Sequence, residues 1–139
     1  MPASDSLGVI EGLTSIQSSF DPKELMDRLV AEISAKGMSV FGRIDHAAGA
    51  AEVGLTLRPT ELIIFGNARA GTPLIQSEQT IGIDLPLRAL VWEDAAGKTW
   101  LSYNEPSWIT RRHGVRNPEQ VSKMSAVLST LARKAANPN

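Results

Sequence analysis

Asp45 and His46 are neighbouring side chains with the chemistry for acid–base work. A histidine titrates near neutral pH, and a carboxylate that meets it raises its pKa and fixes its tautomer. The pair ends a predicted strand, where rigid scaffolds often present reactive groups. Adjacent strand residues point to opposite faces of a sheet, so the two side chains need not meet. His46 is therefore interpreted either as a general base or single metal ligand, or as a turn residue that hydrogen-bonds to the backbone.

Three further polar residues, Asn67, Arg69 and Thr72, surround the end of a predicted buried strand. Backbone N–H groups at the start of the next helical turn, together with Arg69, can hold a carboxylate or a phosphate. Gly66 and Asn67 are equally well explained as turn residues with permissive φ angles. Tyr103, the single tyrosine, can offer a hydroxyl to a ligand, although packing in the core is the favoured interpretation.

The sequence excludes several chemistries. There is no cysteine, so disulfides, thiolate metal sites and cysteine nucleophiles are ruled out. His113 is interpreted as the end of a helix, and no closely spaced pair of histidines exists, so we predict no metal site and no cofactor. The glycines match no nucleotide-binding fingerprint. A net charge of -1 opposes nucleic-acid binding. The basic cluster Arg111, Arg112 and Arg116 is instead expected to be solvated or to pair with acidic residues of another subunit.

The elements that must position these residues follow from apolar periodicity and from capping residues. Helices are predicted at 22–36, 106–113 and 118–136. Strands are predicted at 9–18, 38–44 and 58–65, followed by a hairpin of 87–92 and 98–103. Residues 45–54 are expected to form a loop or a short helix, and 71–75 a short helical turn capped by Thr72. Residues 1–6 are interpreted as a frayed tail.

The chain of 139 residues is 42% hydrophobic, which predicts one globular domain. Strands grouped around a few helices, without regular alternation, indicate an α+β class with a mainly antiparallel sheet. The predicted hairpin is apolar on both faces: Leu90 and Trp92 lie on one, Ala89 and Val91 on the other. Both faces need cover, so we expect a homodimer, with Trp92 and Trp100 as core or interface residues.

Several linked segments occur in order: Ile44-Asp-His-Ala-Ala-Gly49, Thr60-Glu-Leu-Ile-Ile-Phe-Gly-Asn67, Gly71-Thr-Pro-Leu-Ile-Gln76, Asp84-Leu-Pro-Leu-Arg-Ala-Leu-Val-Trp-Glu-Asp94 and Trp100-Leu-Ser-Tyr-Asn104. Together they resemble the bacterial and archaeal family called domain of unknown function 302, over residues 13–113. The resemblance implies a small α+β domain, commonly a homodimer. It transfers no catalytic residue. The helix at 118–136 lies outside these motifs and is expected either to cover the domain or to join a partner subunit.

Three functions remain open. The first is a dimeric binding or sensing module for a small molecule, with a pocket formed by 45–54, 67–72 and the hairpin. The second is a small enzyme that uses Asp45 and His46, and the third is a purely structural or partner-binding dimer. The first is favoured because no convincing nucleophile or cofactor fingerprint is present. No membrane span or secretory signal is recognised, so we expect a cytoplasmic protein without a membrane partner.

Overall fold

The computed structural model describes residues 10–138; the predicted tail at 1–6 and the predicted strand residue Val9 lie outside this range. The strands are β1 (Leu13–Ser18), β2 (Ser39–Asp45), β3 (Thr60–Gly66), β4 (Leu87–Glu93) and β5 (Thr99–Asn104). The helices are α2 (Pro22–Ala35), α3 (His46–Glu52), α4 (Ala68–Ser77), the 3₁₀ turn η1 (Gln79–Ile83), α5 (Pro106–Arg112) and α6 (Pro118–Ala136).

The five strands form one sheet in the order β1-β5-β4-β3-β2, and every neighbouring pair is antiparallel. Strands β4 and β5 form the predicted hairpin, whose turn is stabilised by Asp94. The backbone N–H groups of Ala96 and Lys98 donate to one carboxylate oxygen of Asp94, and the indole of Trp100 donates to the other. The α+β fold with a mainly antiparallel sheet, predicted from the sequence, is confirmed.

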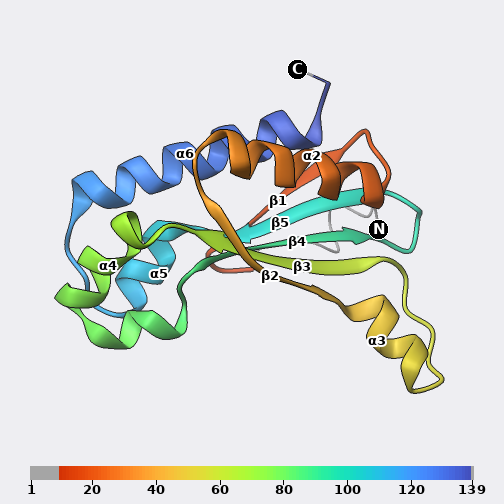
Figure 1. Cartoon of the computed structure of the whole chain (residues 1–139), viewed down its shortest axis with the longest axis horizontal. Helices are drawn as coiled ribbons and strands as arrows, with labels where there is room; N and C mark the ends of the chain where they lie inside the picture. The colour runs from red at the N-terminus through yellow and green to blue at the C-terminus, as the bar shows by residue number, and fades with distance from the viewer. Residues whose placement is uncertain (1–9, 139) are drawn as a thin grey trace.

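Helices α2 and α6 lie side by side over one face of the sheet (Figure 1). Asp21 caps α2 as predicted, since its side chain accepts from the backbone N–H of Glu24. The strand residues that meet these helices include Ile63, Phe65 and Leu101, all fully buried. This core holds the sheet rigidly beneath the two helices, because close-packed side chains leave little room for movement.

Helix α6 belongs to this core. Leu128, Leu131, Ala132 and Ala135 of α6 are all buried in the same cluster as the α2 side chains. The alternative that this helix leaves the domain to join a partner subunit is therefore not needed to bury its apolar stripe. Ser18 ties the C-terminal end of α6 to β1, because its hydroxyl donates to the carbonyl of Ala136 at 2.7 Å.

The opposite face of the sheet has no helix over it among residues 10–138 (Figure 1). Leu62, Leu90 and Trp92 point to this face by strand alternation and pairing, and all three are partly exposed. Trp92 stacks on Trp100 with ring centroids 6.2 Å apart. The sequence predicts a hairpin with two apolar faces that both need cover. Among residues 10–138, α2 and α6 cover one of these faces only.

Two local predictions need correction. The helical turn expected at 71–75 with Thr72 as its cap is a longer helix, α4, that starts at Ala68. Asn67 caps it instead, because its side chain accepts from the N–H of Ala70, and Pro73 lies inside the helix. The 3₁₀ turn η1 was not predicted. Residues 45–54 were expected to form either a loop or a short helix, and the structure has the helix α3 there. This helix extends from the sheet and has no buried residue (Figure 1).

Candidate functional site

An apolar pocket of about 410 Å³ lies at the end of the sheet where β2 begins and β3 ends. Its walls come from four separate parts of the chain: the end of α2 with the start of β2, the β3–α4 junction, the start of β4, and α6. Pockets for small molecules are commonly of this size and are lined mostly by apolar groups. The pocket is therefore large enough for a small organic ligand.

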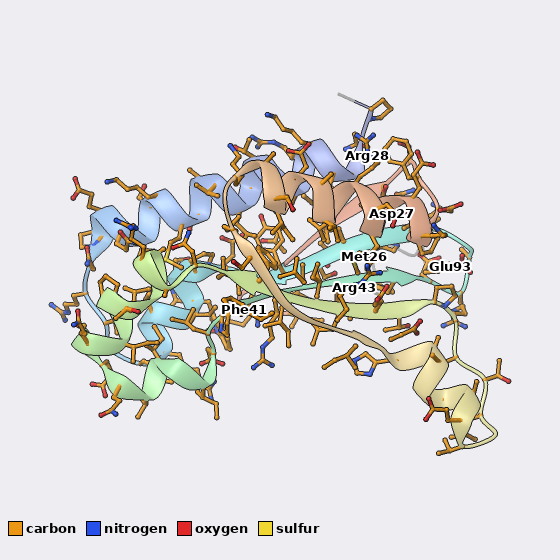
Figure 2. The ribbon with its side chains drawn as sticks, viewed as in Figure 1. Met26, Asp27, Arg28, Phe41, Arg43 and Glu93 are labelled. Atoms are coloured by element: carbon orange, nitrogen blue, oxygen red, sulfur yellow. The ribbon has the colours of Figure 1, made fainter. Side chains whose placement is uncertain are left out.

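The pocket walls are largely apolar side chains. Phe41 of β2 is 58% exposed at its opening, and Figure 2 shows it on the side of the strand nearer α4. Ile75 of α4 and Met124 of α6 contribute partly buried surface from two facing helices. Leu85 and Leu87 flank Pro86, which follows a cis peptide bond, and line the remaining wall. A ligand here would be held chiefly by burial of its apolar surface.

The polar groups of the pocket are few. The side chain of Asn67 is used by the α4 cap, and the amide of Gln120 donates to the carbonyl of Ala70 at 3.2 Å, linking α6 to α4. Lys36 and Lys123 are the charged residues that line the pocket, and both are exposed. Within residues 10–138, no carboxylate lies within 4.0 Å of either ammonium group. The pocket thus combines an apolar interior with two unpaired positive charges.

The backbone at the pocket edge is shaped by Gly66. Its φ of 152° lies in a region that favours glycine. A Cβ atom built there would meet the Pro86 side chain at 3.7 Å, an ordinary contact distance. The glycine is therefore explained by the backbone conformation that connects β3 to α4. It is not needed to make room for a neighbouring side chain.

The candidate residues named from the sequence separate in space. Asn67 and Thr72 line the apolar pocket, whereas Arg69 of the same helix is exposed and does not. Asp45 lines a different hollow, and His46 is exposed as the first residue of α3. The carboxylate of Asp45 accepts from the N–H of Ala48 at 2.9 Å, so it caps α3. No hydrogen bond joins Asp45 to His46 in the described part of the chain.

The hollow that contains Asp45, here called the polar groove, has a volume of about 560 Å³. It lies between the start of α2 and the second half of β2, and Figure 2 shows Arg43 of β2 close to Met26 of α2. The guanidinium of Arg43 makes two hydrogen bonds to the carboxylate of Glu61, at 2.8 and 3.0 Å. The hydrogen bonding of Arg43 to Glu61 is the main cause of the raised pKa of Arg43, and the negative charge of Glu61 raises this pKa further. The charged groups of this groove therefore all have partners: Arg43 and Glu61 pair with each other, Asp21 and Asp45 cap helices, and Lys23 pairs with Asp27.

Tyr103 is 4% exposed and lies in the main core under α6. Burial raises the pKa of its hydroxyl, and the nearby charge of Glu105 adds to this. Thr14 of β1 donates a hydrogen bond to the Glu105 carboxylate beside it. This environment keeps Tyr103 neutral and packed, away from both hollows.

His113 makes a set of contacts that its place in the sequence does not suggest. Its Nε2 lies 2.6 Å from a carboxylate oxygen of Asp84, and its Nδ1 lies 2.9 Å from the hydroxyl of Thr80. Nη1 of Arg112 also donates to both oxygens of the same carboxylate. A hydroxyl, an imidazole and a carboxylate in series are also the parts of a nucleophilic triad. Neither hollow includes these residues, so we interpret this His113 cluster as a link between η1 and α5.

Sequence reasoning missed Lys36, Phe41 and Lys123 as pocket residues. They lie on three elements that are distant along the chain, and no short motif joins them. The available signal was indirect: the apolar stripe of α6 includes Met124 and Val127, which both line the pocket. Across residues 10–138 there is no group of three or more side chains suited to hold a metal ion.

A five-stranded antiparallel sheet with helices over one face and a lateral apolar pocket defines a small α+β domain. The chain belongs to the family described as "Domain of unknown function DUF302", whose model matches residues 14–131. The match runs well into α6, beyond residue 113, where the resemblance inferred from the sequence ends. This agrees with the packing of α6 in the core.

Two bacterial relatives are named "Fluoride-specific ion channel FluC 1", from Brucella suis biovar 1 (strain 1330) and Brucella abortus biovar 1 (strain 9-941). Each is 46% identical to this chain over 127 residues, or 90% of it. The match covers 50% and 47% of those proteins, so this chain spans about half of their length. Among residues 10–138 no helix combines the length and the apolar character of a membrane span.

A solved structure has the same fold: the crystal structure of an uncharacterized conserved DUF302 protein from Bacillus stearothermophilus. It superimposes with a TM-score of 0.80 at 16% sequence identity. The superposition covers 91% of this chain and 99% of the other. At this identity the likeness establishes the fold.

Proposed function

We propose that this domain is a small-molecule binding or sensing module of the cytoplasm, and that its ligand occupies the apolar pocket. The observation that carries the proposal is a hollow of about 410 Å³ with mostly apolar walls, beside two of the residues named from the sequence, Asn67 and Thr72. A pocket of this kind recognises apolar molecules. The activity in the names of the Brucella proteins refers to those whole proteins, and the matched part is about half of each. That activity is not part of this proposal.

The test uses N-phenyl-1-naphthylamine, a neutral apolar dye whose fluorescence rises on transfer from water to an apolar site. We expect saturable binding with one dye per chain. Thr72→Trp should fill the pocket opening and lower the affinity about tenfold or more. Gln76→Trp is the matched control, because Gln76 is also exposed on α4 but does not line the pocket. Absence of saturable binding, or equal loss in both variants, would overturn the proposal.

Native mass spectrometry of protein purified without added ligand complements this test. A stoichiometric extra mass that is retained by the wild type and lost from Thr72→Trp would reveal the natural ligand. The same extra mass on both proteins would place it elsewhere and count against the pocket.

The enzyme alternative has less support. It requires Asp45 to orient His46, and Asp45 is engaged in capping α3. Replacement of His46 by Ala is expected to leave dye binding and folding unchanged, because His46 is exposed and lines neither hollow.

We further propose that the module is a homodimer that uses the helix-free face of the sheet. Ile44 on this face is 45% exposed, next to partly exposed Leu62 and Leu90. Contiguous exposed apolar surface of this kind is typical of protein–protein contacts. A second copy is the proposed occupant because the resemblance to the family favours a homodimer and the helix side of the sheet is already covered.

Light scattering coupled to size-exclusion chromatography tests the dimer. Ile44→Lys should shift the protein toward the monomer mass, because it places a charge in the proposed interface. Leu57→Lys is a matched control, since Leu57 is also 45% exposed but lies outside the sheet. A monomeric wild-type protein would overturn the dimer and leave the pocket proposal untouched.

A further inference from the structure

The structure points to an amphipathic anion as the ligand: we propose that the pocket binds a molecule with an apolar body and one carboxylate. This inference rests on the proposed function, because it concerns the same pocket and names the class of its ligand. It adds a preference for charge to the preference for apolar surface, and the two can be tested separately.

The charge argument begins with Lys36 and Lys123. Lys36 follows the last turn of α2, and Lys123 lies in the first turns of α6, so the two lysines reach the pocket from different helices. In the part of the chain that the structure describes, no acidic side chain lines this pocket. Neither ammonium group has a carboxylate within 4.0 Å in residues 10–138. Two positive charges without an ion-pair partner within 4.0 Å among residues 10–138 favour an anion at the pocket opening.

The partly buried apolar side chains of the pocket indicate where the rest of the ligand lies. The lysines are exposed, whereas Met38, Ile75 and Met124 are partly buried. Methionine side chains adapt to irregular apolar ligands because they are flexible and polarizable. A carboxylate can therefore remain near the solvent-exposed lysines while an alkyl chain or ring enters between α4 and α6.

Other anion-binding features contribute little. Asn67 at the N-terminus of α4 already accepts from the N–H of Ala70, and Arg69 lies outside the pocket. In the polar groove Arg43 is paired with Glu61 and Lys23 with Asp27, and in the His113 cluster Arg112 is paired with Asp84. Among residues 10–138, Lys36 and Lys123 are positive charges beside an apolar hollow that have no ion-pair partner within 4.0 Å.

The test compares decanoate with decan-1-ol, which share an alkyl chain of the same length but differ in charge. Each competes with N-phenyl-1-naphthylamine for the wild-type protein at pH 7. We expect decanoate to compete at about fivefold lower concentration than the alcohol, since two exposed charge contacts make modest contributions. The preference should shrink in about 0.5 M NaCl, because exposed charges are screened.

The double variant Lys36→Met, Lys123→Met removes both charges and keeps most of each side-chain stem. It should bind decan-1-ol as well as the wild type does, but it should lose the preference for decanoate. The control Lys98→Met, Lys134→Met makes the same change in net charge at exposed lysines outside the pocket, and should keep the preference.

The outcomes separate the two proposals. Equal competition by decanoate and decan-1-ol, or preference for dodecylamine over both, would overturn the anion inference while the pocket proposal stands. An equal loss of preference in both double variants would overturn it as well, because the effect would follow net charge rather than position. Failure of the dye itself to bind would overturn the proposed function, and the inference with it.

Discussion

The apolar pocket and the polar groove lie along the same strand, yet they use charge in opposite ways. In the first half of β2, Phe41 lines the pocket, and within residues 10–138 the two lysines of this pocket have no carboxylate within 4.0 Å. In the second half, Arg43 and Asp45 line the groove, where Arg43 is bound to Glu61 and Asp45 caps α3. Charged groups with internal partners stabilise a fold, whereas unpaired charges beside an apolar hollow are available to a ligand.

This difference also explains why the polar groove is the weaker candidate for a ligand site. A ligand that enters the groove would compete with hydrogen bonds that already exist. Breaking a satisfied polar contact offsets the gain from a new one. The pocket imposes no such cost, because its walls present mainly apolar atoms.

The largest effect is expected from Phe41→Glu. A carboxylate at the pocket wall repels a carboxylate ligand and reduces apolar contact, so affinity for both the neutral dye and decanoate should fall about tenfold or more. Stability should change little, since Phe41 is 58% exposed. Fluorescence titration and urea denaturation measure the two effects.

Val53→Glu is the control for this change. Val53 is 71% exposed near α3 and lines neither hollow, so the variant should bind as the wild type does. If both glutamate variants lost affinity equally, net charge rather than the pocket wall would be responsible.

The next largest effect is expected at His113, a hydrogen-bonded residue outside both hollows. His113→Ala removes the contacts with Asp84 and Thr80, and should lower the free energy of unfolding by about 1–2 kcal/mol. Dye binding should stay unchanged, because His113 does not line the pocket. Urea denaturation and fluorescence titration are the measurements. Unchanged stability with impaired binding would reverse the assignment of this cluster to the fold.

A smaller effect is expected from Arg43→Met in the groove. The pair with Glu61 is partly solvated, with side-chain exposures of 42% and 23%, so its loss should cost roughly 0.5–1 kcal/mol. The difference from the wild type in urea denaturation should decrease at high salt, where the pair is screened. Binding of the dye and of decanoate should not change. A drop in decanoate affinity would show that the groove also takes part in ligand binding.

The fold was more accessible to sequence reasoning than the pocket. Asp21 with Pro22, and Asn117 with Pro118, mark helix starts through local chemistry, and both helices begin as predicted. Local signals failed at α4, where Thr72 looked like a cap and Asn67 is the actual one. Caps of similar chemistry compete within a few residues, and tertiary packing selects between them.

The pocket was less predictable because it is assembled from non-local elements. Asn67 and Thr72 were identified as candidates because they follow a buried strand, and they lie at the pocket. Lys36 and Lys123 are 87 positions apart and meet the same hollow only after α2 and α6 pack on the sheet. Neither periodicity nor spacing predicts that juxtaposition, since it depends on how two amphipathic helices are placed across the sheet.

The smallest effect is a pH dependence at Asp94, whose charge is committed to the β4–β5 turn. Its pKa is lowered below the ordinary value of 3.8, chiefly by the hydrogen bond from Trp100 and then by the backbone N–H of Lys98. A carboxyl group with a lower pKa in the folded state binds protons more readily when unfolded. Its contribution to stability is therefore fully present above about pH 4–5, and is lost as the pH falls through the folded-state pKa.

Asp94→Asn should accordingly lower Tm at pH 7, and the difference from the wild type should shrink steadily below pH 4. Thermal unfolding followed by circular dichroism across pH 2–7 measures this. Glu93→Gln is the control at the neighbouring position, where no hydrogen bond to the carboxylate is described in residues 10–138. A Tm difference for Asp94→Asn that stayed constant down to pH 2 would mean that the amide fails for steric reasons. The charge of Asp94 would then not contribute to the stability of the fold.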